Sequence, residues 1–162
     1  MKPMNIRVAG LGGMGVLKCA EILSTALFRA GYDVKKAEVH GMSQRGGSVA
    51  SDVRFGDQVL SPMIPEGEMD ALIVLDPGEA AAHQPHLRAG GFILQAADFD
   101  AIPLPSRRSL GVAMLGALSR RLDVPAAIWT AVLHDVFSEP ARADNIRAFE
   151  LGQTRGPGET LP

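Results

Sequence analysis

The sequence predicts an α/β fold: a single three-layer, Rossmann-like domain with a mixed sheet and a C-terminal helical segment. Three observations predict it. A short strand, a glycine turn and an amphipathic helix succeed one another over 5–31, a continuous apolar run at 71–75 is typical of a strand buried on both faces, and helical patterns fill 110–152. The 162 residues fit one domain. We assign it to residues 1–152 and expect a flexible tail over 153–162.

The composition is that of an ordinary globular protein, with 46% hydrophobic and 21% charged residues. Sixteen Lys and Arg against 18 Asp and Glu give a net charge of −2, so no overall basic field attracts nucleic acid. The apolar runs are too short to span a membrane, and Met1–Arg7 is too polar to begin a secretory signal. We therefore expect a cytoplasmic chain that binds neither nucleic acid nor membranes.

The first motif is the turn between the strand Asn5–Gly10 and a helix that begins at Val16 and ends before Gly31. The helix has one apolar stripe: Val16, Ala20, Leu23, Leu27 and Ala30. The turn has the pattern G-x-G-x-x-G, and its glycines are Gly10, Gly12, Gly13 and Gly15. Because the free N–H groups of a helix start favour an anion, the turn is a candidate dinucleotide or phosphate site. The alternative is a tight strand-to-helix crossing that holds no ligand.

The second motif is the segment HGMSQRGG, which is too rich in glycine and polar groups to form a helix or a core. Its residues are His40, Gly41, Met42, Ser43, Gln44, Arg45, Gly46 and Gly47. We predict a loop that presents polar side chains, with a plain glycine-rich turn as the alternative. It connects two expected strands, Asp33–Val39 and Ser48–Phe55, without a crossover helix, so part of the sheet should be antiparallel. This disfavours a NAD-binding unit, in which Glu38 would be the acidic residue after the second strand.

The rest of the sequence alternates between turns, strands and helices. We expect, in order, a hairpin return at Val59-Leu60, a loop at 61–68, a buried strand at 71–75, a surface helix at 77–88 closed by Gly90-Gly91, a strand at 92–95, an irregular segment at 97–109, two helices at 110–118 and 126–136, and a short helix ending near Gly152. The pair Arg107-Arg108 could contact a phosphate, but a solvated loop is favoured.

The sequence offers few side chains that could bind a metal ion or a redox centre. Cys19 is the single cysteine, which excludes an internal disulfide and any iron–sulfur or zinc site built from the chain's own thiolates. The four histidines are scattered: His40, His83, His86 and His134. His83 and His86 are three residues apart, but Pro85 lies between them, so a solvated helix end is favoured over a metal site. We expect no metal site.

Four stretches of the chain together resemble the gamma subunit, or gamma domain, of the 2-oxoacid:ferredoxin oxidoreductases, which include pyruvate, 2-oxoglutarate and indolepyruvate enzymes. They are GLGGMG with its helix at 10–31, EVHGMSQRGGSVASDVRFG at 38–56, LSPMIPEGEMDALIVLDPGEA at 60–80, and LGALSRRLDVP with NIRAFELG within 115–152. The resemblance covers nearly the whole chain, and HGMSQRGGSV is its most distinctive part.

The resemblance implies a subunit without a redox centre. In the family, partner subunits hold thiamine diphosphate and the iron–sulfur clusters. The complex decarboxylates a 2-oxo acid oxidatively, passes the acyl group to coenzyme A and sends electrons to ferredoxin. The implied substrate is pyruvate, indolepyruvate or another aryl 2-oxo acid. The chain itself is expected to carry no catalytic residue and to bind no cofactor with its own ligands.

The resemblance also indicates what the two motifs could do. Ser43 and Arg45 in the polar loop, together with the glycine turn, are candidates to contact a coenzyme A phosphate or a partner subunit, Arg45 through charge-assisted hydrogen bonds. For His40, a structural role is favoured over a proton shuttle. The family usually has glutamine where Met14 stands and asparagine near Gly111, and a longer connection before Leu110.

Two other readings stay open at the level of sequence. One is a free-standing nucleotide-binding module that uses the glycine turn, and the other is a pure assembly domain. In isolation the chain is expected to form a homodimer, because an apolar surface normally covered by partners often pairs with itself.

Overall fold

The computed structural model describes residues 1–40 and 47–157. Within these residues the strands are β1 (Met4–Leu11), β2 (Asp33–His40), β3 (Ser48–Gly56), β4 (Met69–Val74) and β5 (Leu87–Gln95). The α-helices are α1 (Val16–Arg29), α2 (Ala80–His83), α3 (Leu110–Ser119), α4 (Ala126–Val136) and α5 (Ala141–Arg155). Short 3₁₀ turns are η1 (Pro77–Glu79), η2 (Gln84–His86), η3 (Ala96–Phe99) and η4 (Arg107–Ser109).

The described strands form one mixed sheet in the order β2-β3-β1-β4-β5. β3 is antiparallel to both β1 and β2, whereas β1, β4 and β5 are parallel. The predicted antiparallel part is thereby confirmed. The predicted hairpin return at Val59-Leu60 is wrong, because both edges of β3 are already paired. These residues lie in the connection to β4, where the Val59 N–H donates to the Asp33 carboxylate at 2.7 Å.

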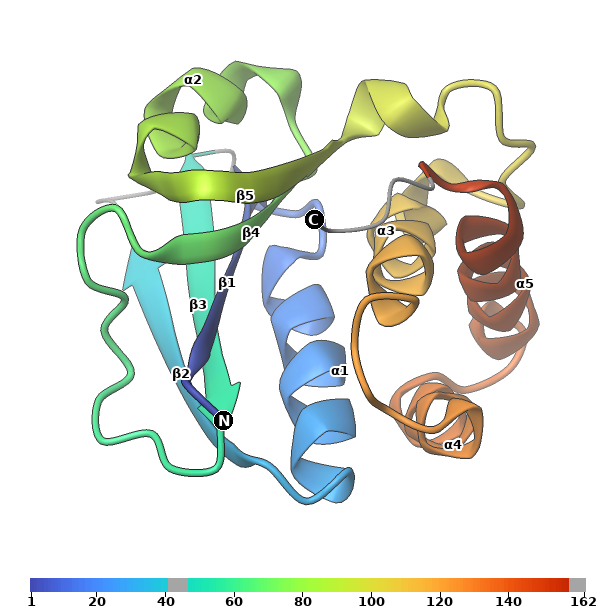
Figure 1. Cartoon of the computed structure of the whole chain (residues 1–162). Coiled ribbons are helices and arrows are strands. Elements are labelled where there is room, and N and C mark those ends of the chain that lie inside the picture. Colours follow the sequence, from blue (N-terminus) through green and yellow to red (C-terminus); the bar gives the residue numbers. More distant parts are fainter. Residues whose placement is uncertain (41–46, 158–162) are drawn as a thin grey trace.

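The longer helices, α1, α3, α4 and α5, build successive layers against one face of the sheet (Figure 1). α1 packs on the sheet, and α3, α4 and α5 form a further layer that contacts α1 through α3 and α4. The stripe predicted for α1 is buried apart from its last member, Ala30, and meets strand residues such as Ile6, Val8 and Ile73 in the main core. The three-layer α/β prediction is confirmed, with both helical layers on the same face.

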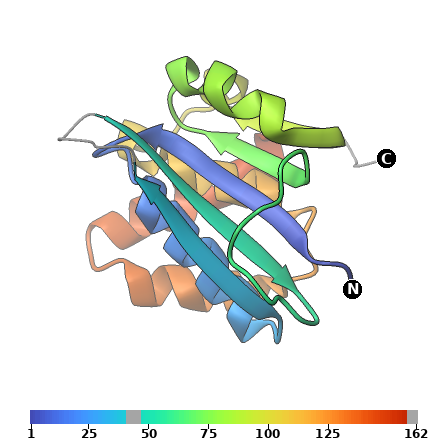
Figure 2. The same ribbon diagram turned by 90° about the vertical axis from the view of Figure 1, so that its left-hand side faces the viewer.

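The opposite face of the sheet, turned toward the viewer in Figure 2, has a smaller apolar cluster. It consists of Ala9, Ala50, Met69, Leu72 and Val74, and the partly buried Ile64 and Ala80 pack against it. The segment 77–86, which contains α2, therefore covers this second face.

The surface helix predicted for 77–88 is wrong in its extent. Its helical turns end at His86, and β5 already begins at Leu87, so Gly90 and Gly91 lie inside a strand instead of closing a helix. A Cβ on Gly91 would stand 3.0 Å from the Met69 carbonyl oxygen and 3.2 Å from that of Asp70. Glycine is required there because β5 pairs closely with β4 at a shift in register between Met69 and Ala71.

The C-terminal helices confirm the predictions for α3 and α4 but not for α5. α5 runs over 15 residues to Arg155, so the prediction of a short helix that ends near Gly152 is wrong, and 153–155 are helical instead of tail. Gln153 Nε2 donates to Ser119 Oγ at 3.1 Å, which fixes this last turn to α3. Residues 158–162 of the predicted tail lie outside the described residues. No helix of the described chain is long and apolar enough to cross a membrane.

Candidate functional site

The glycine turn joins the end of β1 to the start of α1 in a backbone shape that needs glycine. Gly13 and Gly15 have φ angles of 90° and 86°, in the left-handed region, and Gly15 caps α1 without a side-chain hydrogen bond. A Cβ on Gly10 would stand 3.0 Å from Val16 Cγ2 and 3.1 Å from Leu75 Cβ. The turn therefore serves close packing, as in the alternative interpretation of a tight strand-to-helix crossing. It also leaves the start of α1 without a side-chain cap, as an anion site would.

The two predicted motifs meet in the structure. The Gly12 N–H donates to the Gly47 carbonyl oxygen at 2.9 Å, because β3 begins beside the end of β1, with Leu11 opposite Ser48. His40 is the last residue of β2. Residues 41–46, including Ser43 and Arg45, lie outside the described residues, so the roles predicted for them stay predictions.

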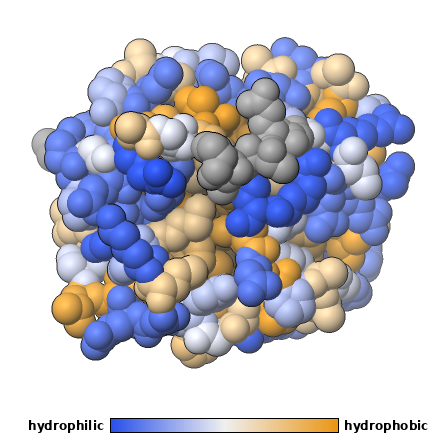
Figure 3. Space-filling view, in the orientation of Figure 1, coloured by the Kyte–Doolittle hydropathy of each residue, from blue (hydrophilic) through white to orange (hydrophobic). Residues whose placement is uncertain are grey.

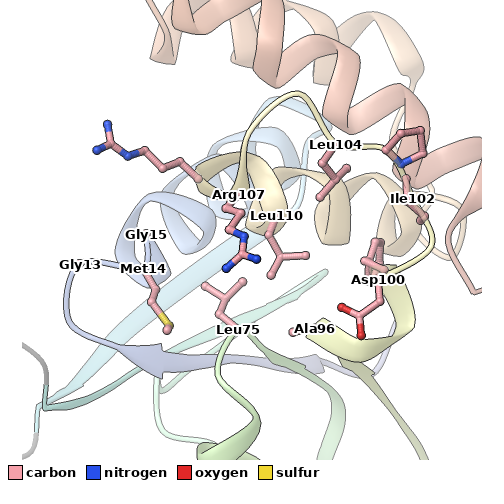
Figure 4. A pocket seen from close by; sticks show the side chains of 13 residues that line it. Gly13, Met14, Gly15, Leu75, Ala96, Asp100, Ile102, Leu104, Arg107 and Leu110 are labelled. Carbon is pink, nitrogen blue, oxygen red and sulfur yellow. The ribbon is translucent and has the colours of Figure 1, made fainter.

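A pocket of about 850 Å³ opens beside the glycine turn (Figure 4). It lies at the carboxyl ends of β1 and β4, two parallel neighbours whose next segments leave toward opposite faces of the sheet, α1 to one and 77–86 to the other. Open α/β sheets bind their ligands at this kind of position. The lining residues are Gly13, Met14, Gly15, Leu75, Ala96, Phe99, Asp100, Ile102, Pro103, Leu104, Arg107, Arg108 and Leu110.

The walls of the pocket are apolar, and its charges are at the surface. The side chains of Ile102, Leu104 and Leu110 form part of the wall. Arg107 and Arg108 are exposed, and their side chains make no hydrogen bond or ion pair to any described residue. With the start of α1 these two guanidinium groups favour an anionic group on a partly apolar molecule, whereas the carboxylate of Asp100, which is exposed and also lines the pocket (Figure 4), opposes it.

Sequence reasoning predicted that 97–109 is irregular, which is confirmed, but missed that it forms the pocket wall. The apolar Ile102 and Leu104 among prolines were the signal that could have found it. The exposure of Arg107 and Arg108 fits the solvated interpretation, and their place at the pocket keeps the phosphate interpretation open.

The structure gives a reason for glycine at position 111. A Cβ on Gly111 would stand 2.3 Å from Cys19 Sγ, so the first turn of α3 lies directly against α1 and has no space for a larger side chain. Cys19 is buried, and desolvation raises the pKa of its thiol to about 12. Cys19 is therefore a protonated packing residue, not a nucleophile or a metal ligand. Met14, where the resemblance leads us to expect glutamine, is 39% exposed at the pocket.

The NAD interpretation fails on the order of the strands. A dinucleotide-binding unit places its second strand, with the acidic residue, next to the first. Here β3 lies between β1 and β2, so Glu38 is two strands away from the glycine turn.

Polar side chains on the second face of the sheet hold the base of the predicted loop. The Arg7 guanidinium donates to both carboxylate oxygens of Asp52, at 2.6 and 2.9 Å, and its Nη1 lies 3.4 Å from His83 Nδ1. Glu79 lies 3.6 Å from His83 Nε2 and accepts from Ser48 Oγ at 2.8 Å. Ser48 follows Gly47 at the start of β3, so this cluster fixes the segment 77–86 to one end of the loop.

His83 is thus not at a solvated helix end. Desolvation and, next, the Arg7 charge hold the pKa of its imidazole below the ordinary 6.5, although Glu79 opposes this. Arg7 can only donate, so Nδ1 accepts and the neutral ring carries its proton on Nε2, toward Glu79. His86 instead contacts the exposed Glu66 at 2.8 Å. Among the described residues no group of three or more potential ligands could hold a metal ion.

The lowered pKa of His83 predicts a loss of stability in mild acid. The unfolded chain, with its imidazole pKa near 6.5, takes up the proton more readily than the folded one, so stability falls as the pH drops below this value toward the folded pKa. Urea unfolding from about pH 7.5 to about pH 5 should show a shallower decline in the free energy of unfolding for His83→Gln than for the unchanged protein. Equal slopes for His83→Gln and the unchanged protein would contradict the assignment.

Comparison with known proteins agrees with this architecture. The family model "Pyruvate ferredoxin/flavodoxin oxidoreductase" matches residues 5–111. The indolepyruvate oxidoreductase subunit IorB of Pyrococcus horikoshii is 43% identical over 119 residues, which cover 73% of this chain and 57% of that one. The chain therefore spans little more than half the length of this relative.

Two solved structures have the same fold. The 2-oxoglutarate:ferredoxin oxidoreductase of Magnetococcus marinus, solved with 2-oxoglutarate, coenzyme A and succinyl-CoA bound, superposes with a TM-score of 0.83 at 23% identity, over 100% of this chain and 32% of that one. The gamma subunit of a keto/oxoacid ferredoxin oxidoreductase from Geobacter sulfurreducens gives 0.75 at 20% identity, over 92% and 95%. The match over 5–111 includes the first three of the four sequence blocks and confirms the family resemblance, and the chain belongs to the pyruvate ferredoxin/flavodoxin oxidoreductase family.

Proposed function

We propose that this chain is a cytoplasmic subunit, without a redox centre of its own, of a 2-oxoacid:ferredoxin oxidoreductase. The complex would decarboxylate indolepyruvate or another aryl 2-oxo acid oxidatively to the acyl-CoA and pass the electrons to ferredoxin. The observation that carries the proposal is the 43% identity to an indolepyruvate oxidoreductase subunit over 119 residues.

The donor set of the chain supports a division of labour with partner subunits. Iron–sulfur clusters are held by cysteine thiolates, and the single cysteine of this chain is buried with its thiol pKa raised to about 12. The residues therefore do not fit a cluster. Thiamine diphosphate supplies the electron sink for loss of carbon dioxide when a partner subunit binds it. This chain would contribute assembly and part of an acceptor-site wall.

Exposed apolar side chains support assembly with partners. On the face seen in Figure 3, apolar surface gathers near the middle of the view, over α1. Met14, Leu17 and Phe28, in α1 and the turn before it, are 39%, 37% and 70% exposed. Apolar groups of this kind on an otherwise polar surface are typical of interfaces.

Purification of the tagged chain from its native cells tests the function. We expect a brown complex that contains a thiamine-binding subunit and reduces ferredoxin with indolepyruvate and coenzyme A, whereas the chain alone shows no oxidation of 2-oxo acids with a dye acceptor. Activity of the isolated chain, or purification of a colourless chain under gentle conditions, would overturn the proposal. The second outcome would favour the free-standing nucleotide-binding module.

Coenzyme A binding at the pocket gives a second test within this proposal. Among the described residues the start of α1 has no side-chain cap and the side chains of Arg107 and Arg108 have no partner, so they suit its phosphates, and the apolar wall suits the rest of such a molecule. Because charge-assisted hydrogen bonds contribute about 1.5 to 3 kcal/mol, Arg107→Ser with Arg108→Ser should raise the KM for coenzyme A about tenfold or more. The KM for the 2-oxo acid should not change. Arg147→Ser on the exposed side of α5 is the matched control.

The substitution Arg45→Ala distinguishes a role of the loop in coenzyme A binding from a role in assembly alone. If its guanidinium contacts a coenzyme A phosphate, Arg45→Ala raises the KM for coenzyme A in a complex of unchanged composition. If the loop only docks a partner, the same change weakens the complex and leaves the KM of the remaining complex unaltered. Gel filtration of the complex together with the KM measurement distinguishes these outcomes.

A further inference from the structure

One long edge of the sheet has no partner strand in the described structure. β2 is the terminal strand, and its pairing with β3 uses only one of its two edges over Asp33–His40. An eight-residue edge presents a row of backbone donors and acceptors that another strand can pair with. Lys36 and Glu38 are exposed on this strand, and Val39 is 43% exposed.

The charges of β2 select one way in which two copies can pair. Side chains alternate between the faces of a sheet, so a continuous antiparallel pairing of two identical strands needs a twofold axis through one residue. With the axis at Lys36, two ammonium groups lie opposite each other. With the axis at Glu38, two carboxylates do.

An axis at Ala37 removes both repulsions. Lys36 of each copy then lies opposite Glu38 of the other, which gives two opposite-charge pairs on the face that packs on α1. On the second face, Lys35 lies opposite Val39 of the other copy, where the aliphatic part of the lysine can cover the exposed valine. Among the three central registers this is the one in which the charges attract.

We propose that the free chain forms a homodimer by antiparallel pairing of β2 with β2 of a second copy, with the twofold axis at Ala37. The sheet then continues through both copies. The occupant is a second copy because the attraction between Lys36 and Glu38 arises from the twofold symmetry of this strand with itself. The inference is independent of the proposed catalytic function.

Charge reversal tests the register in the full-length chain. Sedimentation velocity should show a dimer at micromolar concentration. Either Lys36→Glu or Glu38→Lys should weaken dimerisation about tenfold or more, because each reverses two symmetry-related pairs. The double variant should dimerise like the unchanged chain. An equimolar mixture of the two single variants should form heterodimers, because one copy then presents two carboxylates and the other two ammonium groups.

Cross-linking measures the position of the axis. Opposite residues of an antiparallel pair have Cα atoms about 4.5 to 5.5 Å apart, which suits a disulfide. Ala37→Cys should therefore form a disulfide dimer on mild oxidation, and the buried Cys19 should not compete. Val39→Cys is the control, since its two copies would lie about 14 Å apart along the strands.

The proposal has clear contrary results. A chain that stays monomeric at every concentration overturns it. A β2 edge that pairs only with a different subunit, and not with a second copy of this chain, also overturns it. A dimer that is indifferent to both charge reversals, or that cross-links as fast through Val39→Cys as through Ala37→Cys, also overturns it.

Discussion

Replacing Gly152 with alanine should lower the free energy of unfolding by about 3 kcal/mol or more, because α3 and α5 touch through their backbones. A Cβ at Gly152 would stand 1.8 Å from the Ala113 carbonyl oxygen, and one at Gly116 would stand 2.1 Å from that of Phe149. The obstacle is backbone in both cases, so no side chain can move aside and the helices must separate. Separation would also loosen Gln153 from Ser119.

Urea unfolding monitored by circular dichroism measures this effect. Gly116→Ala should behave like Gly152→Ala, since it acts on the same contact from the other helix. Glu150→Ala, at an exposed position of α5, is the control and should change stability by less than about 0.5 kcal/mol. Wild-type stability for both glycine variants would show that the helices do not approach this closely.

Replacing Asp52 with alanine should cost about 3 to 5 kcal/mol, because it leaves a guanidinium inside the protein without its carboxylate. The Asp52 side chain is 3% exposed and that of Arg7 is 15% exposed, and two hydrogen bonds join them. The cost reflects the uncompensated charge more than the bonds. Adding Arg7→Met to Asp52→Ala should therefore recover much of the loss.

A second Arg–Asp ion pair, joined by one hydrogen bond of similar length, is the control. Arg29 Nη2 lies 2.7 Å from Asp135 Oδ2, but these side chains are 39% and 60% exposed. Solvent screening makes such a pair worth about 1 kcal/mol or less, so Asp135→Ala should have a small effect in the same urea titration. Equal losses from Asp52→Ala and Asp135→Ala would show that burial does not govern the cost.

The sequence alone predicted the features that depend on neighbouring residues. The period of apolar residues defined α1, the left-handed end at Gly31 followed from glycine's freedom at positive φ, and the link of β2 to β3 without a helix required an antiparallel pair. The order of four sequence blocks identified the family. The first three of these signals each lie within a few tens of residues, whereas the four blocks run from residue 10 to residue 152.

Only the tertiary structure decided the features that join distant segments. The hairpin predicted at Val59-Leu60 could be rejected only with the knowledge that β1 also pairs with β3. The extent of the helix predicted at 77–88 could be corrected only with the knowledge that β5 pairs with β4. The pocket brings 96–110 against the turn at 13–15, and Gly152 is interior because α3 lies against it. Apolar periodicity encodes which face of an element is buried, but not which element covers it, because that choice depends on how the whole chain packs.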